Sequence, residues 1–209
     1  LYCWRANGRR FENFRRIYTD RYSLGDNRIA SLYRDRFGTF WAGTWYAGAS
    51  RVDLGSGGFA RIVRHGDGPL ALEDNKARAF ADAGGGKLWI ATNGGLHHYD
   101  PALGIIGTHR HQPDNPNSLM DVAAHALARD RRGLLWIGSS SGVTSFDPAR
   151  GRFTRMALFA GDPKANNVRA MMTDRAGYIW ITTRGGMHRL DPQSRQIVSY
   201  RHDPSKHAS

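Results

Sequence analysis

Gly177-Tyr178-Ile179-Trp180-Ile181-Thr182-Thr183 is one of four copies of a short phrase that organises this sequence. The three other copies are Gly38-Thr39-Phe40-Trp41-Ala42-Gly43-Thr44, Gly86-Lys87-Leu88-Trp89-Ile90-Ala91-Thr92 and Gly133-Leu134-Leu135-Trp136-Ile137-Gly138-Ser139. Their tryptophans lie 48, 47 and 44 positions apart (41 to 89, 89 to 136, 136 to 180). A period of about 40–50 residues with turn residues around each apolar run predicts the blades of a β-propeller.

The last copy shows how one repeat is built. Asp174-Arg175-Ala176-Gly177 predicts a tight turn in which the aspartate accepts hydrogen bonds from turn amides and glycine takes a positive φ. Gly185-Gly186 predicts the next hairpin. These turns separate four predicted antiparallel strands, namely 168–172, 178–183, 187–190 and 196–201.

Applied to the whole chain, the period predicts an all-β fold of four complete blades and an N-terminal half-blade. We place these in a single propeller segment, 1–209, with the half-blade at 1–27 and the blades at 28–75, 76–122, 123–166 and 167–209. The first residues, 1–4, align with 96–99, so the half-blade lacks its two inner strands. We therefore expect an open fragment of a larger ring, completed by remaining blades of the same chain.

The second blade departs from the pattern at its first turn. Ala83 stands where the other complete blades have aspartate, and Asp82 comes one place early. With Gly84, Gly85 and Gly86 beside it, this turn is expected to be looser than the others.

The chain is basic, with 30 Lys+Arg against 18 Asp+Glu and a net charge of +12. Because these charges are spread along the chain, we interpret them as an arginine-rich surface and expect no nucleic-acid partner. No apolar run approaches the roughly 20 residues of a membrane helix, and no signal peptide is visible. The single cysteine, Cys3, excludes an internal disulfide.

The repeated Asp-x-x-Gly turn, the Trp-Ile-Gly/Ala-Thr strand and the Tyr/Phe-Asp-Pro turn together resemble the two-component regulator propeller repeat, as does the linker 113–119. The resemblance covers essentially the whole chain. It implies the periplasmic, ligand-sensing propeller of an inner-membrane signalling receptor, such as a hybrid histidine kinase or a receptor with a diguanylate cyclase output. A β-sandwich, a membrane helix and the output domain would follow the propeller.

No pattern of catalytic or metal-binding residues stands out. Asp35, Asp130 and Asp174 are interpreted as turn caps, and the four repeated tryptophans as core between blades rather than a sugar-stacking ladder. His97 and His98 point to opposite faces of a strand, whereas His109 and His111 share a face and could chelate zinc. Since no third ligand lies in phase, we expect no metal site and no cofactor.

The candidate ligand site lies on the loops that join the second and third strands and on the linkers between blades. Trp45 and Tyr46, in an enlarged loop, could stack on a sugar ring or pack against the adjacent blade. Near the start of the inner strands, Arg78, His125 and Arg169 could bind an anionic group such as a uronate or sulfate, or could satisfy linker carbonyls. Arg184, in the corresponding loop of the last blade, joins this set of candidate ligand-binding residues.

The sequence thus favours a non-enzymatic sensor segment that binds a small-molecule or oligosaccharide ligand, with carbohydrate as the expected class. One alternative is a structural or dimerising arc that could form a homodimer and leaves the ligand site elsewhere in the receptor. The other is a propeller lyase or hydrolase. Only two glutamates, Glu12 and Glu73, are present to serve the enzymatic alternative.

Overall fold

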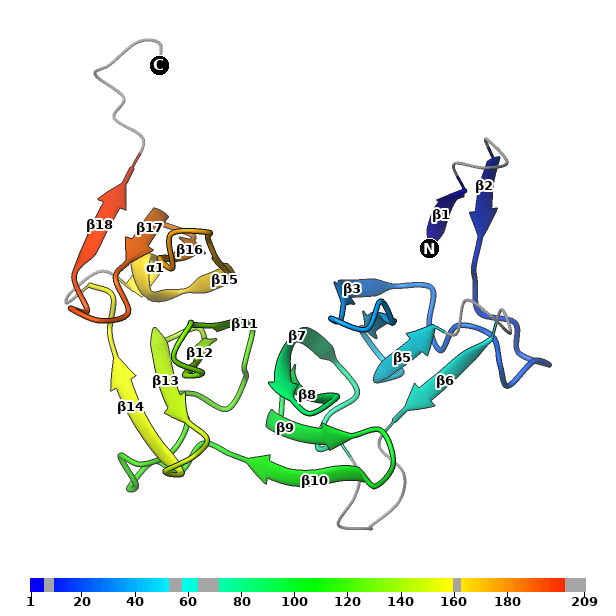
Figure 1. The fold of residues 1–209 in the computed structure, drawn as a ribbon, viewed down its shortest axis with the longest axis horizontal. Coiled ribbons are helices and arrows are strands. Elements are labelled where there is room, and N and C mark those ends of the chain that lie inside the picture. Colours follow the sequence, from blue (N-terminus) through cyan, green and yellow to red (C-terminus); the bar gives the residue numbers. More distant parts are fainter. Residues whose placement is uncertain (6–9, 53–57, 64–71, 160–162, 202–209) are drawn as a thin grey trace, which may run out of the picture. The chain divides into compact units, whose positions relative to one another are not determined.

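The computed structural model describes residues 1–5, 10–52, 58–63, 72–159 and 163–201, and nearly all of its regular structure is β (Figure 1). The sheets comprise one two-stranded and four four-stranded antiparallel sheets, which confirms the predicted half-blade and four complete blades. The chain divides into two compact units, residues 1–108 and 109–209. Each unit is described by itself.

The first unit holds the half-blade and two blades. The half-blade consists of β1 (Tyr2–Arg5) and β2 (Arg10–Asn13). The first blade contains β3 (Ile29–Arg34), β4 (Phe40–Thr44), β5 (Ala49–Val52) and β6 (Phe59–Ile62). The second blade contains β7 (Ala77–Gly84), β8 (Lys87–Thr92), β9 (Gly95–Asp100) and β10 (Gly104–His109).

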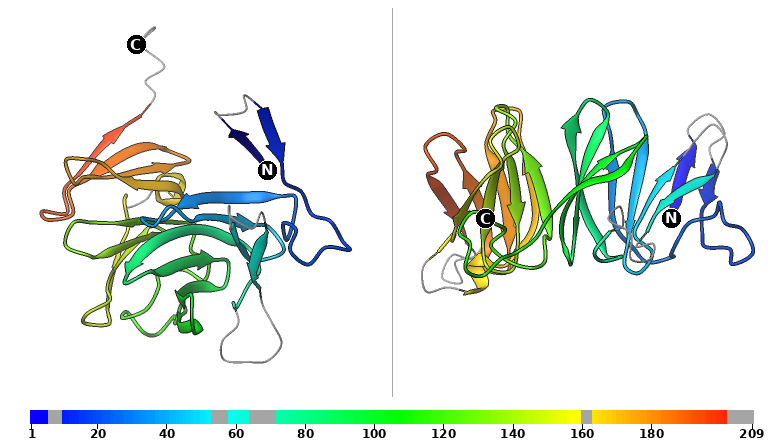
Figure 2. Two further views of the ribbon diagram at one scale, coloured as in Figure 1. Left: turned by 45° about the vertical axis from the view of Figure 1, so that its right-hand side comes forward. Right: turned by 90° about the horizontal axis from the view of Figure 1, so that it is seen from below.

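The second unit holds two further blades and one helical turn. The third blade contains β11 (Ala126–Arg129), β12 (Leu135–Gly138), β13 (Val143–Asp147) and β14 (Arg152–Met156). After α1 (Pro163–Asn166), the fourth blade contains β15 (Val168–Thr173), β16 (Ile179–Thr183), β17 (Gly186–Leu190) and β18 (Ile197–Tyr200). In every blade the strands pair in chain order, as twisted meanders (Figures 1 and 2).

Two of the four repeated tryptophans, Trp41 and Trp136, form core between neighbouring blades, as predicted. Within the first unit, Trp41 of the first blade is buried against Phe80 and Ile90 of the second. Within the second unit, Trp136 of the third blade is buried with Val168 and Ile181 of the fourth. Burial of a large aromatic ring at each of these seams supplies much of the hydrophobic free energy that joins one blade to the next.

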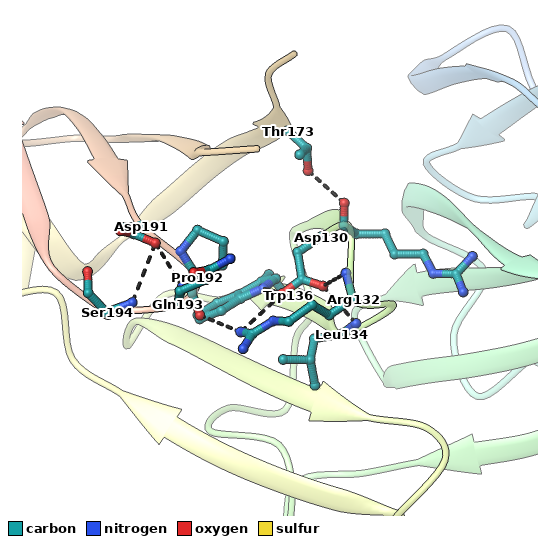
Figure 3. Close-up of polar contacts among 10 residues, drawn as sticks. Asp130, Arg132, Leu134, Trp136, Thr173, Asp191, Pro192, Gln193 and Ser194 are labelled. Atoms are coloured by element: carbon teal, nitrogen blue, oxygen red, sulfur yellow. Dashed lines mark hydrogen bonds and ion pairs between the residues drawn. The ribbon is translucent and has the colours of Figure 1, made fainter. Parts of the chain in front are cut away.

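An aspartate ties each of three first turns to the tryptophan of the following strand. In each case Oδ1 accepts hydrogen bonds from two turn amides, and Oδ2 accepts one from the indole Nε1–H (Figure 3 shows Asp130). The Nε1–Oδ2 distances are 3.1 Å for Trp41–Asp35, 3.3 Å for Trp136–Asp130 and 2.7 Å for Trp180–Asp174. The predicted role of these aspartates as turn caps is therefore confirmed, and the cap also satisfies a polar group of the core.

The turn of the second blade is tighter than expected, so the prediction of a loose turn was wrong. β7 and β8 stay paired up to Gly84 and Lys87, which leaves a hairpin loop of only two residues, Gly85 and Gly86. All three glycines have positive φ, as such a tight hairpin requires. The Trp89 ring stacks on His98, with ring centroids 4.3 Å apart.

The outer strands of the blades are built in two ways, which alternate along the chain. In the second and fourth blades a fully buried histidine on the third strand bonds hydroxyls on both sides: His97 contacts Thr92 and Thr108, and His188 contacts Thr183 and Ser199. The first and third blades have Ser50 and Thr144 at these positions, paired with Arg61 and Arg155 on the fourth strand. These arginines reach the preceding linker, where they donate to Ser23 and Ser118.

Replacing Asp130 with alanine should destabilise the third blade strongly. The change strands two turn amides and the indole N–H of Trp136, which is 2% exposed, at a cost of about 3 kcal/mol. Urea unfolding followed by tryptophan fluorescence measures this loss. Asp147→Ala is the matched control, with a smaller expected loss, because Asp147 Oδ1 also accepts two turn amides, from Ala149 and Arg150, but in the surface turn between β13 and β14 of the same blade. Equal losses in the two variants would contradict a special role for the indole contact.

Stability should also fall in acid through Asp174. The indole N–H of Trp180 and then the turn amides hold the pKa of the Asp174 carboxyl below its usual value. Its stabilising contribution is therefore complete above the unfolded-state pKa of about 3.9 and is lost as the pH falls through the lower folded-state pKa. Thermal unfolding from pH 6 to pH 2.5 should show a smaller acid-induced drop for Asp174→Asn than for the wild type. An unchanged drop would assign the acid sensitivity to other carboxyls.

Candidate functional site

The loop between β4 and β5 in the first blade is fixed by both neighbouring linkers. The amide of Trp45 donates to the carbonyl of Arg28, 3.1 Å away, and the amide of Gly48 donates to the carbonyl of Asn75, 2.7 Å away. Thr44 Oγ1 closes the loop through the carbonyl of Gly48, at 2.8 Å. The loop is thus held in one conformation between the linker that enters its own blade and the linker that enters the next.

Glycine is required at the end of this loop. Gly48 has a φ of 67°, and a Cβ there would lie 2.1 Å from the carbonyl oxygen of Ile62. Any other residue would displace β6 or the loop itself. This position therefore decides how the two aromatic side chains just before it are presented.

A cation from a flanking linker lies over each of these two aromatic rings. Lys76 Nζ lies 3.5 Å from the centroid of the Trp45 ring, and the guanidinium carbon of Arg28 lies 4.8 Å from that of Tyr46. The two rings are tilted at 47° with centroids 6.5 Å apart. Trp45 is 40% exposed and Tyr46 60% exposed, so both rings keep surface that a ligand can reach.

Arg78 extends this group along the start of β7. Its Nε donates to Oδ1 of Asn93, in the β8–β9 loop, at 2.6 Å. Burial and then the nearby charge of Arg78 lower the pKa of the Lys76 ammonium. We call Arg28, Trp45, Tyr46, Lys76 and Arg78 the cation–aromatic cluster. Three of these, Trp45, Tyr46 and Arg78, were predicted from the sequence.

Arg28 and Lys76 were missed, although they share a sequence signal. Each follows an Asp-Asn pair at the end of a linker, and the aspartate accepts the backbone amide of the basic residue: Asp26 from Arg28 at 3.1 Å and Asp74 from Lys76 at 2.7 Å. This turn fixes where each basic side chain begins. The Asp-Asn-Arg/Lys repeat could have marked both positions.

The other three predicted residues lie in the second unit. His125 Nδ1 contacts the carbonyl oxygen of Val168 at 3.3 Å, which is the carbonyl-satisfying role considered from the sequence. Arg169 and Arg184 are both exposed, and the backbone amide of Arg184 donates to the carbonyl of Asn167 at 3.3 Å. The predicted site residues therefore divide between the two units.

The histidines weighed as metal ligands have other roles. His97 and His98 do point to opposite faces, with His97 buried among hydroxyls and His98 stacked on Trp89. His109 packs against the rings of Phe146 and Phe153, and Nδ1 of His111 contacts the carbonyl of Leu119 at 2.7 Å. Across the described ranges, no group of three or more His, Cys, Asp or Glu side chains could hold a metal ion. Nor does any helix there have the length and apolar character needed to cross a membrane.

Comparison with solved structures finds similar folds at low sequence identity. The extracellular domain assigned to the hybrid two component system BT3049 of B. thetaiotaomicron has a TM-score of 0.77 and 20% identity, over 92% of this chain and 27% of that one. Virginiamycin B lyase from Staphylococcus aureus has a TM-score of 0.62 and 12% identity, over 85% of this chain and 57% of the lyase. An auxiliary nutrient binding protein from Bacteroides ovatus has a TM-score of 0.56 and 14% identity, over 82% of this chain and 41% of that one. The chain thus spans about a quarter of the BT3049 domain.

Sequence comparison identifies the repeat. No curated protein sequence matches the chain. Two stretches, residues 23–46 and 162–185, match the family described as Two component regulator propeller. Both stretches run from a linker through the innermost strand to the end of the following strand, so they cover equivalent parts of the first and fourth blades. The first and fourth blades therefore each contain a stretch that matches the two-component regulator propeller repeat.

Proposed function

We propose that this chain is part of an extracytoplasmic sensor of a bacterial signal-transduction receptor, and that it binds a ligand without transforming it. The observation that carries the proposal is the cation–aromatic cluster, in which two exposed rings on a loop fixed from both sides lie beside basic side chains from the flanking linkers and β7. Binding residues are commonly found on loops that a rigid scaffold positions. The output domain, a kinase or a cyclase, would lie elsewhere in the receptor.

The chemistry of the cluster favours a carbohydrate with an acidic group. An exposed indole or phenol ring offers a flat apolar surface for the C–H face of a sugar. Lys76 occupies one face of the Trp45 ring and supplies a positive charge beside it. Arg28 and Arg78 add donors suited to a carboxylate or sulfate. A neutral sugar would use the rings alone and should bind more weakly.

The repeat family and the fold support the receptor role. The matched family is named for two-component regulation, and the fold resembles an extracellular domain assigned to a hybrid two component system. The fold also resembles that of virginiamycin B lyase, so a propeller lyase or hydrolase is the alternative function. The cation–aromatic cluster favours binding over that alternative, since its rings and cations recognise a ligand, whereas the carboxylates beside it, Asp26 and Asp74, accept turn amides.

The fourth blade has an apolar face that we propose is covered by a further blade. Met172 is 60% exposed and Met187 40% exposed, and they border a cavity of about 300 Å³ that also contacts Trp180. The corresponding face of the third blade, around Trp136, is buried by the fourth blade. A second copy of the chain, in a homodimer, is the alternative occupant.

Ligand binding should raise the melting temperature of the complete extracytoplasmic region. Thermal-shift screening against matched neutral and acidic oligosaccharides tests this, because a ligand that binds the native state stabilises it by mass action. The acidic members should give the larger shifts. Trp45→Ala and Arg78→Ala should each weaken binding by about tenfold, given the usual strength of ring and charge-assisted contacts.

Phe37→Ala is the matched control for the ligand experiment. Phe37 is also exposed and also carries an arginine, Arg36, over its ring at 4.9 Å, but it lies in the β3–β4 turn of the same blade. Its loss should leave binding unchanged. If no oligosaccharide changes the melting temperature of a well-folded sample, the result would favour the alternative of a structural or dimerising arc.

The isolated 209-residue chain should self-associate through its exposed apolar face. Met172→Lys places a charge at the centre of that face and should reduce association, whereas Tyr18→Lys should not, although Tyr18 is 86% exposed. Sedimentation velocity over a range of concentrations measures the effect. A discrete dimer abolished by Met172→Lys would favour the homodimer, and a wild-type chain that stays monomeric would argue against an interface at this face.

A further inference from the structure

Three turns of the second unit surround a cavity of about 220 Å³ (Figure 3). They are the β11–β12 turn, the β15–β16 turn and the β17–β18 turn, and their lining includes Arg131, Arg132, Tyr178, Asp191 and Pro192. A hydrogen bond of 2.8 Å from Thr173 to the carbonyl of Arg129 joins β15 to β11 beside the cavity. The cavity therefore lies at a seam where the third and fourth blades are held together.

Two arginines at this seam are fixed in place by backbone carbonyls. Arg132 Nη2 donates to the carbonyl of Pro192 at 2.6 Å, and Arg131 Nη2 donates to the carbonyl of Arg175. Arg132 Nη2 also lies 3.7 Å from Oδ2 of Asp130, as an ion pair. A guanidinium has five N–H donors, and these contacts use part of them. The Arg132 side chain is 51% exposed, so its remaining donors are open to a ligand from solvent.

The two aspartates of the cavity are occupied by their own turns. Asp130 accepts from two backbone amides and an indole, and is 6% exposed. Oδ1 of Asp191 accepts the amide of Gln193 at 2.8 Å, and this bond, together with the nearby charge of Arg132, keeps the pKa of Asp191 below its usual value. The lowered pKa keeps the Asp191 carboxylate ionised at neutral pH.

The walls limit the size and charge of an occupant. Tyr178 and Pro192 give the cavity apolar surface, and Arg189 lies 4.5 Å from the centroid of the Tyr178 ring as a third nearby cation. At about 220 Å³ the space is smaller than a usual drug-sized pocket. The negative charges of Asp130 and Asp191 disfavour a doubly charged phosphate more than a singly charged group.

We propose that this cavity binds the carboxylate of a small aliphatic acid or of an acidic side chain, with Arg131 and Arg132 as its donors. A carboxylate fits the planar fork of a guanidinium, and its aliphatic carbons would lie against Tyr178 and Pro192. The site is separate from the cation–aromatic cluster and does not depend on the proposed sensor ligand.

Isothermal titration calorimetry of the full chain tests the proposal with three probes: butyrate, glutamate acetylated at its amino group and amidated at its α-carboxyl group, and inorganic phosphate. Butyrate or the capped glutamate should bind with a measurable heat, and the one that binds more tightly identifies a free acid or a side chain as the source. Arg132→Gln should weaken that binding at least about tenfold, because it removes charge-assisted hydrogen bonds. Arg150→Gln should not, since Arg150 pairs with Asp147 in the β13–β14 turn and does not line the cavity.

Folding of each variant is checked by circular dichroism and thermal unfolding. If Arg132→Gln fails to fold, Arg132→Lys and Arg131→Gln take its place, the first keeping the charge but losing the planar fork. Absence of binding by both carboxylates, tighter binding of phosphate, or undiminished binding in the folded arginine variants would each overturn the proposal.

Discussion

The contact between a turn aspartate and the indole of the next strand is the interaction on which the rest of the fold depends. One carboxylate satisfies two turn amides and the N–H of a buried tryptophan, so turn geometry and core packing are fixed by a single side chain. Because the same ring packs against the next blade, the contact also sets the surface on which that blade rests. The turns it fixes in the third and fourth blades border the carboxylate cavity.

The second blade has a different first turn. Gly85 and Gly86 form a two-residue hairpin loop, Asp82 accepts the amide of Gly84 beside it, and the Trp89 ring stacks on His98. The outer strands vary in a similar way, with a buried histidine between hydroxyls in two blades and an arginine anchored to the linker in the other two. Different residues therefore supply hydrogen-bond partners to buried polar groups in different blades.

Both candidate sites use the blade framework in the same manner. In each, a basic side chain is positioned by backbone hydrogen bonds near a seam between blades: Lys76 by its aspartate turn and Arg132 by the Pro192 carbonyl. Neither side chain is fully buried, so its charge remains available to a ligand. Because these charged side chains are already positioned by the fold, they lose little conformational entropy when a ligand binds.

The all-β class, the number of described blades, the turn caps and the core positions of Trp41 and Trp136 could be predicted from the sequence. The blades follow from a period that recurs along the chain, and the turn caps follow from chemistry that acts over a few residues. The sequence did not predict that Arg28 and Lys76 cover the rings of Tyr46 and Trp45, that Arg61 anchors Ser23, or that His125 contacts the backbone carbonyl of Val168. Many of these contacts join residues tens of positions apart, and they exist because each blade is placed against its neighbour, which no local pattern encodes.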